Sequence, residues 1–396
     1  MKRTALTIFV VCMATMAFAQ QTIDEILMSI AQNNTTLLAL QKQMEAEKGG
    51  NKTGIYLENP EIELHYLWGN NAEVGTRIDF SALQSFDFPT AYHHKGKVAG
   101  EKNRVVDLSY QIERAEILFE ARKKCIEQVY LNALSAELAL RLQHAKQIAD
   151  AYQLKFDKGD CNILELNKSK LNLLNTQREV DLLQIEKERK ISELIQLNGQ
   201  QPLVFSIKEY FPVALPENFE TWYRESLKNN LSMKQKQHET MVNLRNEKLQ
   251  RSLNLPKFSA GYMSEKTTFE HFQGVMIGVS IPLWENKNTM RQIKTQIIAS
   301  LTVEADTEIR FKTESQSLFL KAGRLRKMAS EYAENLNAVT RCDLLKKALD
   351  VGEISLIDYI LELSVYYEAI NNRLETERDY QLTLAELNKW NDVGLN

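Results

Sequence analysis

The sequence has 396 residues, of which 44% are hydrophobic and 26% are charged. This composition is too apolar for a disordered chain and too polar for a helical protein that crosses a membrane many times. With 7 prolines and 15 glycines, the chain has about half the usual frequency of each. The tract between Pro89 and Pro202 and the tract after Pro282 lack proline and are rich in helix-forming residues, which disfavours a compact α/β enzyme.

The N-terminal residues predict export. Two basic residues and a short apolar run precede an Ala-x-Ala cleavage site that ends at Ala19. We therefore expect a signal peptide over residues 1–19, which is too short to be a membrane-spanning helix. Its removal leaves 47 basic and 52 acidic residues, and a net charge of −5 does not suggest nucleic-acid binding.

Three cysteines remain after the signal peptide, namely Cys125, Cys161 and Cys342. Their odd number and the absence of C-x-x-C spacing predict neither a disulfide framework nor a zinc ribbon. They are interpreted as unpaired small residues.

Motifs of enzymes and metal sites are not found in the sequence. His238-Glu239 begins an H-E-x-x-H string, but residue 242 is valine, so the zinc pair is incomplete. No P-loop, nucleophile elbow or dinucleotide fingerprint occurs. His93-His94 is interpreted as a solvated pair. We therefore expect no enzymatic activity, no catalytic residue, no cofactor and no metal site.

The first half of the chain predicts a fixed order of elements. Thr22 and Glu25 form a capping-box pattern at the start of a helix. Segments in which apolar and polar residues alternate follow as strands, and a long proline-free tract follows as a helix that ends near Gly159. The expected elements are a helix over 22–50, strands over 61–68 and 76–80, and helices over 90–158 and 162–198.

The same order recurs in the second half. Asn34 and Asn230 are 196 positions apart, and Gly159 and Gly352 are 193 apart. The expected elements are a helix over 217–252, strands over 257–263 and 274–282, and helices over 288–350 and 355–390. We therefore predict a first repeat over 20–198, a linker over 199–216, a second repeat over 217–391 and a tail over 392–396.

Helix lengths and strand faces add two expectations. The 69-residue helix would span roughly 100 Å, about the summed length of the two shorter helices of its repeat, and its heptad-like apolar seams predict packing between neighbouring helices.

In the strands, Ile62, Leu64 and Tyr66 share one face, as in a barrel wall between lipid and water. An ordinary half-buried sheet fits the same alternation. Because transmembrane barrels need about eight strands or more, several chains would have to contribute to one barrel.

This order of elements, the two glycine turns, the strand-ending prolines Pro89 and Pro282 and the signal peptide together resemble the TolC-like outer-membrane efflux family. The resemblance covers residues 21–391 and implies a mainly α fold with a small β part. It implies a homotrimer with a shared 12-stranded β-barrel in outer-membrane lipid and an α-helical tunnel in the periplasm. The family acts as the passive exit duct of a tripartite pump, with a periplasmic adaptor and an inner-membrane transporter as partners. A secreted coiled-coil scaffold or adhesin without a pore is the alternative.

The resemblance also implies site residues. The glycine turns would dock the adaptor, through Lys158, Gly159, Asp160, Val351, Gly352 and Glu353. Asp358 matches an acidic ring that narrows the tunnel, and Glu165 occupies the corresponding position after the first glycine. The family's second aspartate is replaced by Leu361, with Glu362 beside it. A solvated position on a helix is the alternative for both carboxylates. The short linker implies a reduced girdle around the tunnel.

Overall fold

The computed structural model describes residues 22–71, 74–284, 286–339 and 342–391. The expected signal peptide and the expected tail lie outside the described residues. The chain divides into two compact units, which are described separately. Of the described residues, the tip unit comprises those within 22–33, 121–212 and 328–381, and the sheet unit comprises those within 34–120, 213–327 and 382–391.

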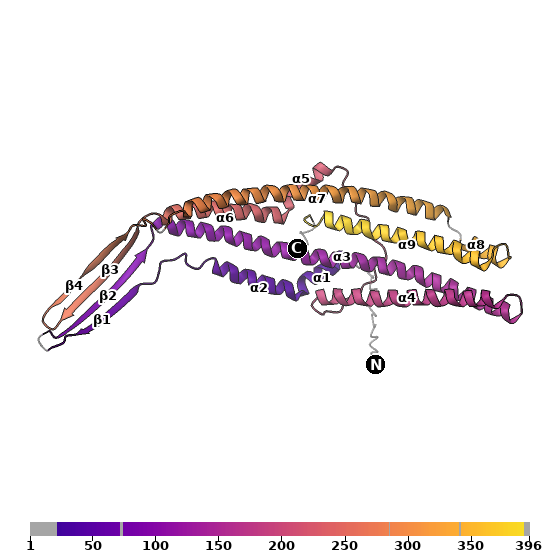
Figure 1. Ribbon diagram of the computed structural model, residues 1–396, viewed down its shortest axis with the longest axis horizontal. Coiled ribbons are helices and arrows are strands. Elements are labelled where there is room, and N and C mark those ends of the chain that lie inside the picture. Colours follow the sequence, from indigo (N-terminus) through magenta and orange to yellow (C-terminus); the bar gives the residue numbers. More distant parts are fainter. Residues whose placement is uncertain (1–21, 72–73, 285, 340–341, 392–396) are drawn as a thin grey trace, which may run out of the picture. The chain divides into compact units, whose positions relative to one another are not determined.

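Helices dominate the described residues and are accompanied by one small antiparallel sheet, which confirms the predicted fold class. Figure 1 labels the elements along the chain. In order they are α1 (Ile23–Asn33), α2 (Thr35–Gly50), β1 (Glu61–Trp68), β2 (Thr76–Phe86), α3 (Pro89–Asp157), α4 (Ile163–Leu197), α5 (Phe219–Asn229), α6 (Leu231–Leu253), β3 (Lys257–Thr267), β4 (His271–Ser280), α7 (Thr289–Val339), α8 (Cys342–Asp350) and α9 (Leu356–Leu387). Of the helices within these ranges, none has the length and hydropathy that a bilayer crossing requires.

The helix expected over 22–50 begins as predicted, because Thr22 and Glu25 exchange two capping hydrogen bonds of 3.2 Å. Its continuity was predicted wrongly. The chain leaves the helical conformation at Asn34, whose φ and ψ are −67° and 117°, and the Asn34 side chain accepts a hydrogen bond from the Leu37 amide. Asparagine is a strong N-cap because its side-chain oxygen satisfies an amide of the first turn.

The helix expected over 217–252 is interrupted in the same manner. Asn230 has φ and ψ of −62° and 108°, and its side chain accepts from the Met233 amide at 2.9 Å. One capping asparagine thus separates α5 from α6, as Asn34 separates α1 from α2.

The long helix α3 is continuous over 69 residues and spans roughly 100 Å. Pro89 is its first residue, where the missing amide hydrogen costs no intrahelical bond. The helix expected over 288–350 is described as α7 and α8, and the residues between them, 340–341, lie outside the described residues.

The sheet contains all four expected strands in the order β1-β2-β3-β4, each pair antiparallel. β2 and β3 are longer than the sequence pattern predicts. The register places Ile62 opposite Ala82, Ala82 opposite Tyr262, and Tyr262 opposite Val275. Because paired residues share a face, the apolar faces of all four strands coincide.

An aromatic cluster holds helices of the sheet unit together. Trp222, Tyr223 and Leu387 are buried together, and Phe219 packs against them. The Phe219 ring centroid lies 5.5 Å from that of Phe319 on α7. This aromatic packing fastens α5 to α7.

The segment after α4 is attached closely within the tip unit. Gly199 has a φ of +62°, and a Cβ atom there would lie 2.2 Å from the Asn33 carbonyl oxygen. Further along, the Tyr210 hydroxyl donates to the Ile126 carbonyl and the Asn132 amide group donates to the Ile207 carbonyl, both at 2.9 Å. The segment therefore lies along α3.

Candidate functional site

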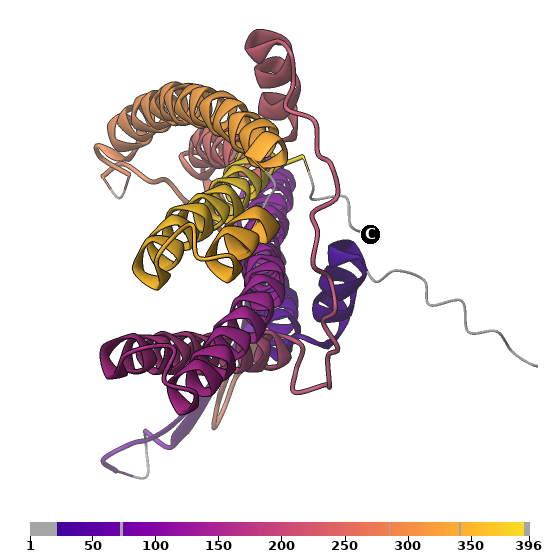
Figure 2. The ribbon, with the colours of Figure 1, turned by 90° about the vertical axis from the view of Figure 1, so that its right-hand side faces the viewer.

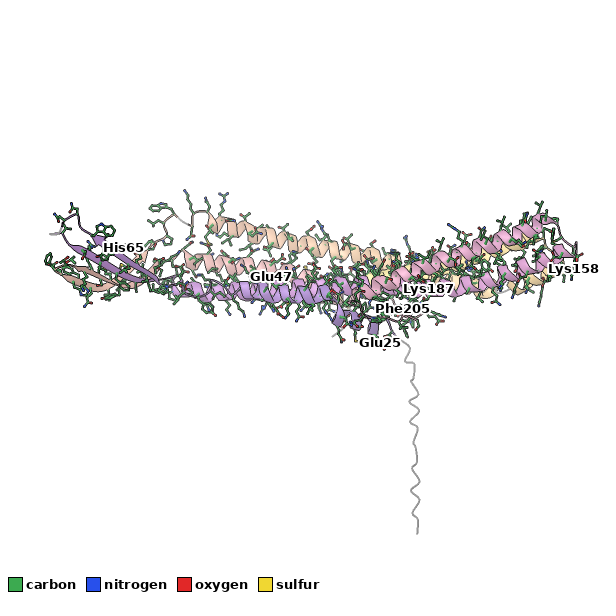
Figure 3. The ribbon with its side chains drawn as sticks, turned by 90° about the horizontal axis from the view of Figure 1, so that it is seen from below. Glu25, Glu47, His65, Lys158, Lys187 and Phe205 are labelled. Carbon is green, nitrogen blue, oxygen red and sulfur yellow. The ribbon has the colours of Figure 1, made fainter. Side chains whose placement is uncertain are left out.

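The first glycine turn closes the hairpin of α3 and α4 in the tip unit. Gly159 has a φ of +81°, a region that glycine occupies at little cost. Its amide donates to the Phe156 carbonyl at 2.9 Å, and the Asp160 amide donates to the Lys155 carbonyl at 2.8 Å. These two bonds form a Schellman motif, which satisfies the last carbonyls of α3. Lys158 is seen at the end of this hairpin in Figure 3.

The second glycine turn has the same geometry. Gly352 also has a φ of +81°. Its amide donates to the Leu349 carbonyl at 3.2 Å, and the Glu353 amide donates to the Ala348 carbonyl at 2.9 Å. The two turns, which lie far apart in the sequence, therefore end their helices with the same pattern of hydrogen bonds.

The turn residues are open to solvent. All six predicted docking residues are exposed. A Cβ atom on Gly159 or Gly352 would meet no other described atom within 4 Å. The backbone conformation, rather than a close neighbour, therefore accounts for glycine at both positions.

Glu165 and Asp358 each complete a capping box directly after a turn. The Glu165 amide donates to the Asn162 side chain at 3.0 Å, and the Asn162 amide donates to the Glu165 carboxylate at 3.1 Å. On α9, the Asp358 amide donates to the Ser355 hydroxyl at 3.2 Å, and that hydroxyl donates to the Asp358 carboxylate at 2.6 Å. Both candidate constriction residues thus have a local structural role at a helix N-terminus.

An apolar cluster joins the two hairpins behind the turns, and Figure 2 views these hairpins end-on. Leu166 and Tyr359, each seven positions after its glycine, are 3% and 2% exposed. The buried members of this tip cluster are Ile148, Tyr152, Leu166, Leu349, Leu356, Tyr359 and Leu363. Sequence analysis did not identify a cluster shared by both hairpins.

Cys161 packs against this cluster beside the first turn. Burial raises the pKa of its thiol, and the nearby Glu165 carboxylate adds to the shift. Cys125, deep in α3, is fully buried, and burial raises the pKa of its thiol to about 12. Neither thiol is therefore activated as a nucleophile.

A polar contact between α3 and α9 was missed at the sequence level. The buried Arg141 donates through Nη2 to the Asn371 side chain at 2.9 Å. The His144 Nδ1 atom lies 3.3 Å from the Tyr367 hydroxyl. These side chains line a cavity of about 370 Å³ among α3, α4 and α9. No motif could have identified them, because Arg141 lies in a long helix with many exposed charges.

The two predicted strand-ending prolines lie between a strand and a helix. Pro89 is three residues beyond the end of β2 and begins α3. Pro282 is two residues beyond the end of β4, before α7.

Solved structures supply comparisons for the whole arrangement. The chain is similar to the CmeC outer-membrane channel of Campylobacter jejuni, with 14% identity, a TM-score of 0.74, and coverage of 94% of this chain and 86% of that one. For the MtrE outer-membrane channel of Neisseria gonorrhoeae, the identity is 11%, the TM-score 0.71, and the coverage 93% and 88%. For the outer-membrane protein VceC of Vibrio cholerae, the identity is 10% and the TM-score is 0.68, with coverage of 93% of this chain and 94% of that one.

No protein-family model matches the sequence, and no curated protein sequence matches it. The likeness is therefore one of structure, and it extends over nearly the whole chain. The chain has the fold of the TolC-like outer-membrane channels.

Proposed function

We propose that the protein is the outer-membrane exit duct of a tripartite efflux or export system. In this role it is a passive channel, with its strands in the outer membrane and its helices in the periplasm. The structural neighbours named above are outer-membrane channels, and their fold is the first support. The coincident apolar faces of the four strands are the observation that carries the proposal.

That sheet face is exposed as well as apolar. Ile62, Val275 and Ile277 are 67%, 83% and 80% exposed, a large cost in water for β-branched side chains. On the opposite face, Arg77 pairs with Asp79 at 2.7 Å and with Glu265 at 3.2 Å. A face for lipid and a charged face for an aqueous lumen fit a barrel wall. A soluble scaffold would gain nothing from this arrangement.

The edges of the sheet support a homotrimer. Among the described strands, β1 and β4 each pair on one side only. Unpaired edges in lipid leave backbone groups unsatisfied, so the sheet must close with other copies. Three copies would supply twelve strands, enough to close a barrel.

The partners are assigned by the same proposal. The two exposed glycine turns dock a periplasmic adaptor, which links the duct to an inner-membrane transporter. Asp358 and Glu165 stand near the periplasmic entrance, where copies from three chains form acidic rings. The adaptor and the transporter select the cargo.

We further propose that the chain is a tandem duplication, with repeats over 20–198 and 217–391. Support comes from the order of the described elements, because each half begins with two helices, two strands and a long helix and ends with a further helix, with α8 additional in the second half. The matching caps at Asn34 and Asn230 and the matching turns at Gly159 and Gly352 add to it.

Cell fractionation without heating tests the proposal. The protein should be recovered from outer-membrane detergent extracts as a trimer. A deletion strain should lose export, and the wild-type gene should restore it. Recovery of the protein only from the soluble fraction would favour the scaffold or adhesin instead.

A further inference from the structure

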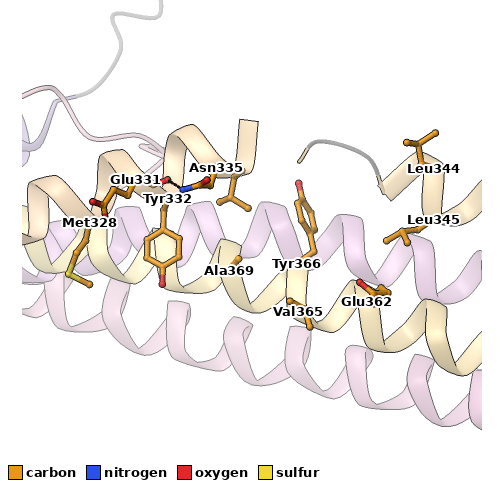
Figure 4. Close-up of a pocket in the computed structure, with 11 residues that line it drawn as sticks. Met328, Glu331, Tyr332, Asn335, Leu344, Leu345, Glu362, Val365, Tyr366 and Ala369 are labelled. Atoms are coloured by element: carbon orange, nitrogen blue, oxygen red, sulfur yellow. Dashed lines mark hydrogen bonds between the residues drawn. The ribbon is translucent and has the colours of Figure 1, made fainter. Parts of the chain in front are cut away.

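Exposed apolar side chains occur in both units. In the tip unit they line a groove among α7, α8 and α9 (Figure 4). The side chains of residues 337–343, which lie in the sequence between the lining residues Leu336 and Leu344, are outside the described part of the chain, so the walls of that groove are only partly defined. In the sheet unit, Ile298 of α7 is 65% exposed and lies in a stretch that is described without a gap.

Four helices of the sheet unit stand in the same order as its strands. Polar contacts join each neighbouring pair, namely Lys48 of α2 with Asp107 of α3 at 2.5 Å, Ser109 of α3 with Gln235 of α6 at 2.8 Å, and Asn243 of α6 with Ser300 of α7 at 3.1 Å. The row α2-α3-α6-α7 therefore follows the row β1-β2-β3-β4. Among these four helices, α2 and α7 are the outer members, as β1 and β4 are the edges of the described sheet.

The contact between α3 and α6 joins the two halves of the chain. The Gln235 amide group donates to the Ser109 hydroxyl, and the His238 Nδ1 atom lies 3.1 Å from a carboxylate oxygen of Glu101. The proposed duplication gives each of these contact faces an equivalent in the other half. The equivalent of the α3 face lies on α7, and the equivalent of the α6 face lies on α2.

The equivalent faces are exposed. The strand-ending prolines of the two halves are 193 positions apart, and the capping asparagines are 196 apart. With these offsets, the equivalent of Ser109 is Thr302, the equivalent of Gln235 is Ala39, and both are exposed. Ser300, which contacts α6, is two positions from Thr302 and therefore lies on the other side of α7. The face of Thr302 thus points away from the rest of the row.

The two exposed faces are complementary in shape. On α7, Ile298 precedes Thr302 by four positions, so the two side chains lie on the same face. On α2, Ala39 and Ala46 are seven positions apart and both are exposed, while Lys48 on the opposite side contacts α3. The small side chains of α2 leave a shallow surface into which the larger side chain of Ile298 can pack.

One position differs in charge from the contact within the chain. The equivalents of Glu101 and His238 are Lys294 on α7 and Lys42 on α2. The Lys42 ammonium group pairs with the Glu45 carboxylate at 2.8 Å, which reduces the repulsion between the two lysines.

We propose that α7 of one copy packs against α2 of the next copy of the chain, with Ile298 and Thr302 against Ala39 and Ala46. This inference rests on the proposed trimer, in which β4 of each copy pairs with β1 of the next and brings these two helices together. The same kind of helix contact then alternates within and between chains, and each exposed face is covered by a second copy.

Cysteine cross-linking in the outer membrane tests this contact. The native Cys125, Cys161 and Cys342 are first replaced by alanine. Ala39→Cys and Thr302→Cys in one chain should then be linked by a short bis-maleimide into a covalent trimer on denaturing gels. Because α3 and α6 stand between the two positions within one chain, the link joins different copies. Either cysteine alone should give only the monomer band.

Ala39→Cys with Val303→Cys is the matched control. Val303 is 47% exposed, but its side chain is rotated by about 100° from that of Thr302 about the helix axis, so this pair should give little covalent trimer. Ile298→Lys should lower the temperature at which the native trimer dissociates, because it places a charge in the contact, whereas Val303→Lys should not. Circular dichroism shows whether each variant folds.

The possible failures are distinguishable. A native trimer that yields no more linked product with Thr302→Cys than with Val303→Cys would overturn the inference and leave the duct in place. Equal dissociation temperatures for Ile298→Lys and Val303→Lys would also overturn it. A protein that is a monomer in outer-membrane extracts would instead overturn the trimer on which the inference rests.

Discussion

Arg141 of α3 and Tyr367 of α9 are joined by two contacts. The guanidinium carbon lies 4.4 Å from the centroid of the Tyr367 ring, and Nη2 donates to the Tyr367 carbonyl at 3.2 Å. Arg141 is only 6% exposed. A cation held against a ring and away from water is a strong polar contact between the two hairpins of the tip unit.

Arg141→Ala should loosen that link. Loss of the cation–π contact and of hydrogen bonds from a charged donor should destabilise the packing of α9 on α3 by about 2 kcal/mol. Amide hydrogen exchange along α9 should accelerate accordingly. Lys146→Ala, at an exposed position of the same helix, is the control and should change little. Unchanged amide hydrogen exchange along α9 in Arg141→Ala would contradict this prediction.

Gly159→Val and Gly352→Val should strain the tip turns. A φ of +81° costs a residue other than glycine about 1 kcal/mol or more. Export should fall while the amount of outer-membrane trimer stays near normal. Gly96→Ala and Gly100→Ala in α3 are controls, because a Cβ atom there meets nothing within 4 Å and the helix favours alanine. Normal export in both valine variants would argue against adaptor docking at the turns.

Asp358→Asn tests the acidic ring. In a trimer three copies of Asp358 would surround the axis, and a ring of carboxylates attracts cations. We predict cation-selective conductance in planar bilayers that divalent or trivalent cations block from the periplasmic side. The block should weaken markedly in Asp358→Asn and less in Glu165→Gln. Both amides retain an oxygen for the capping box, so these variants separate charge from helix capping. Equal blocker affinity in wild type and Asp358→Asn would assign Asp358 to capping alone.

Glu377 predicts a pH dependence of stability. Burial raises the pKa of its carboxyl group above the ordinary value of 4.5, and the negative charge of Glu209 also raises it, while Arg373 opposes the shift. The folded state therefore holds the proton at pH values where the unfolded state has released it. Stability should fall as the pH rises from 4.5 through the folded-state pKa and then level off.

Glu377→Gln should remove that part of the pH dependence. Urea unfolding of the detergent-solubilised protein at several pH values measures it. Glu375→Gln, an exposed position on the same helix, is the comparison. The same slope in wild type and Glu377→Gln would show that this carboxyl group does not carry the effect.

The sequence predicted much of the fold because its signals are local. The capping pattern at Thr22 and the alternation in β1 each depend on residues a few positions apart, and α3 contains no proline after its first residue. The breaks at Asn34 and Asn230 were not predicted, because many proteins tolerate asparagine inside a helix. Whether the helix continues through the asparagine or ends there depends on packing. The contacts of Arg141 were also missed, since they join α3 to Tyr367 and Asn371, which are more than two hundred positions further along the chain. The capping roles of Glu165 and Asp358 were readable from their spacing but were not inferred.

The number of chains in the assembly tests the central claim most directly. Native mass spectrometry of protein extracted from the outer membrane in mild detergent should give three copies of the chain, because one sheet has two unpaired edges and twelve strands close a barrel. Circular dichroism of the same sample should be dominated by helix with a minor β component. A monodisperse monomer that is stable without detergent would contradict the account, because its exposed apolar strand face would then have neither lipid nor neighbouring strands to cover it.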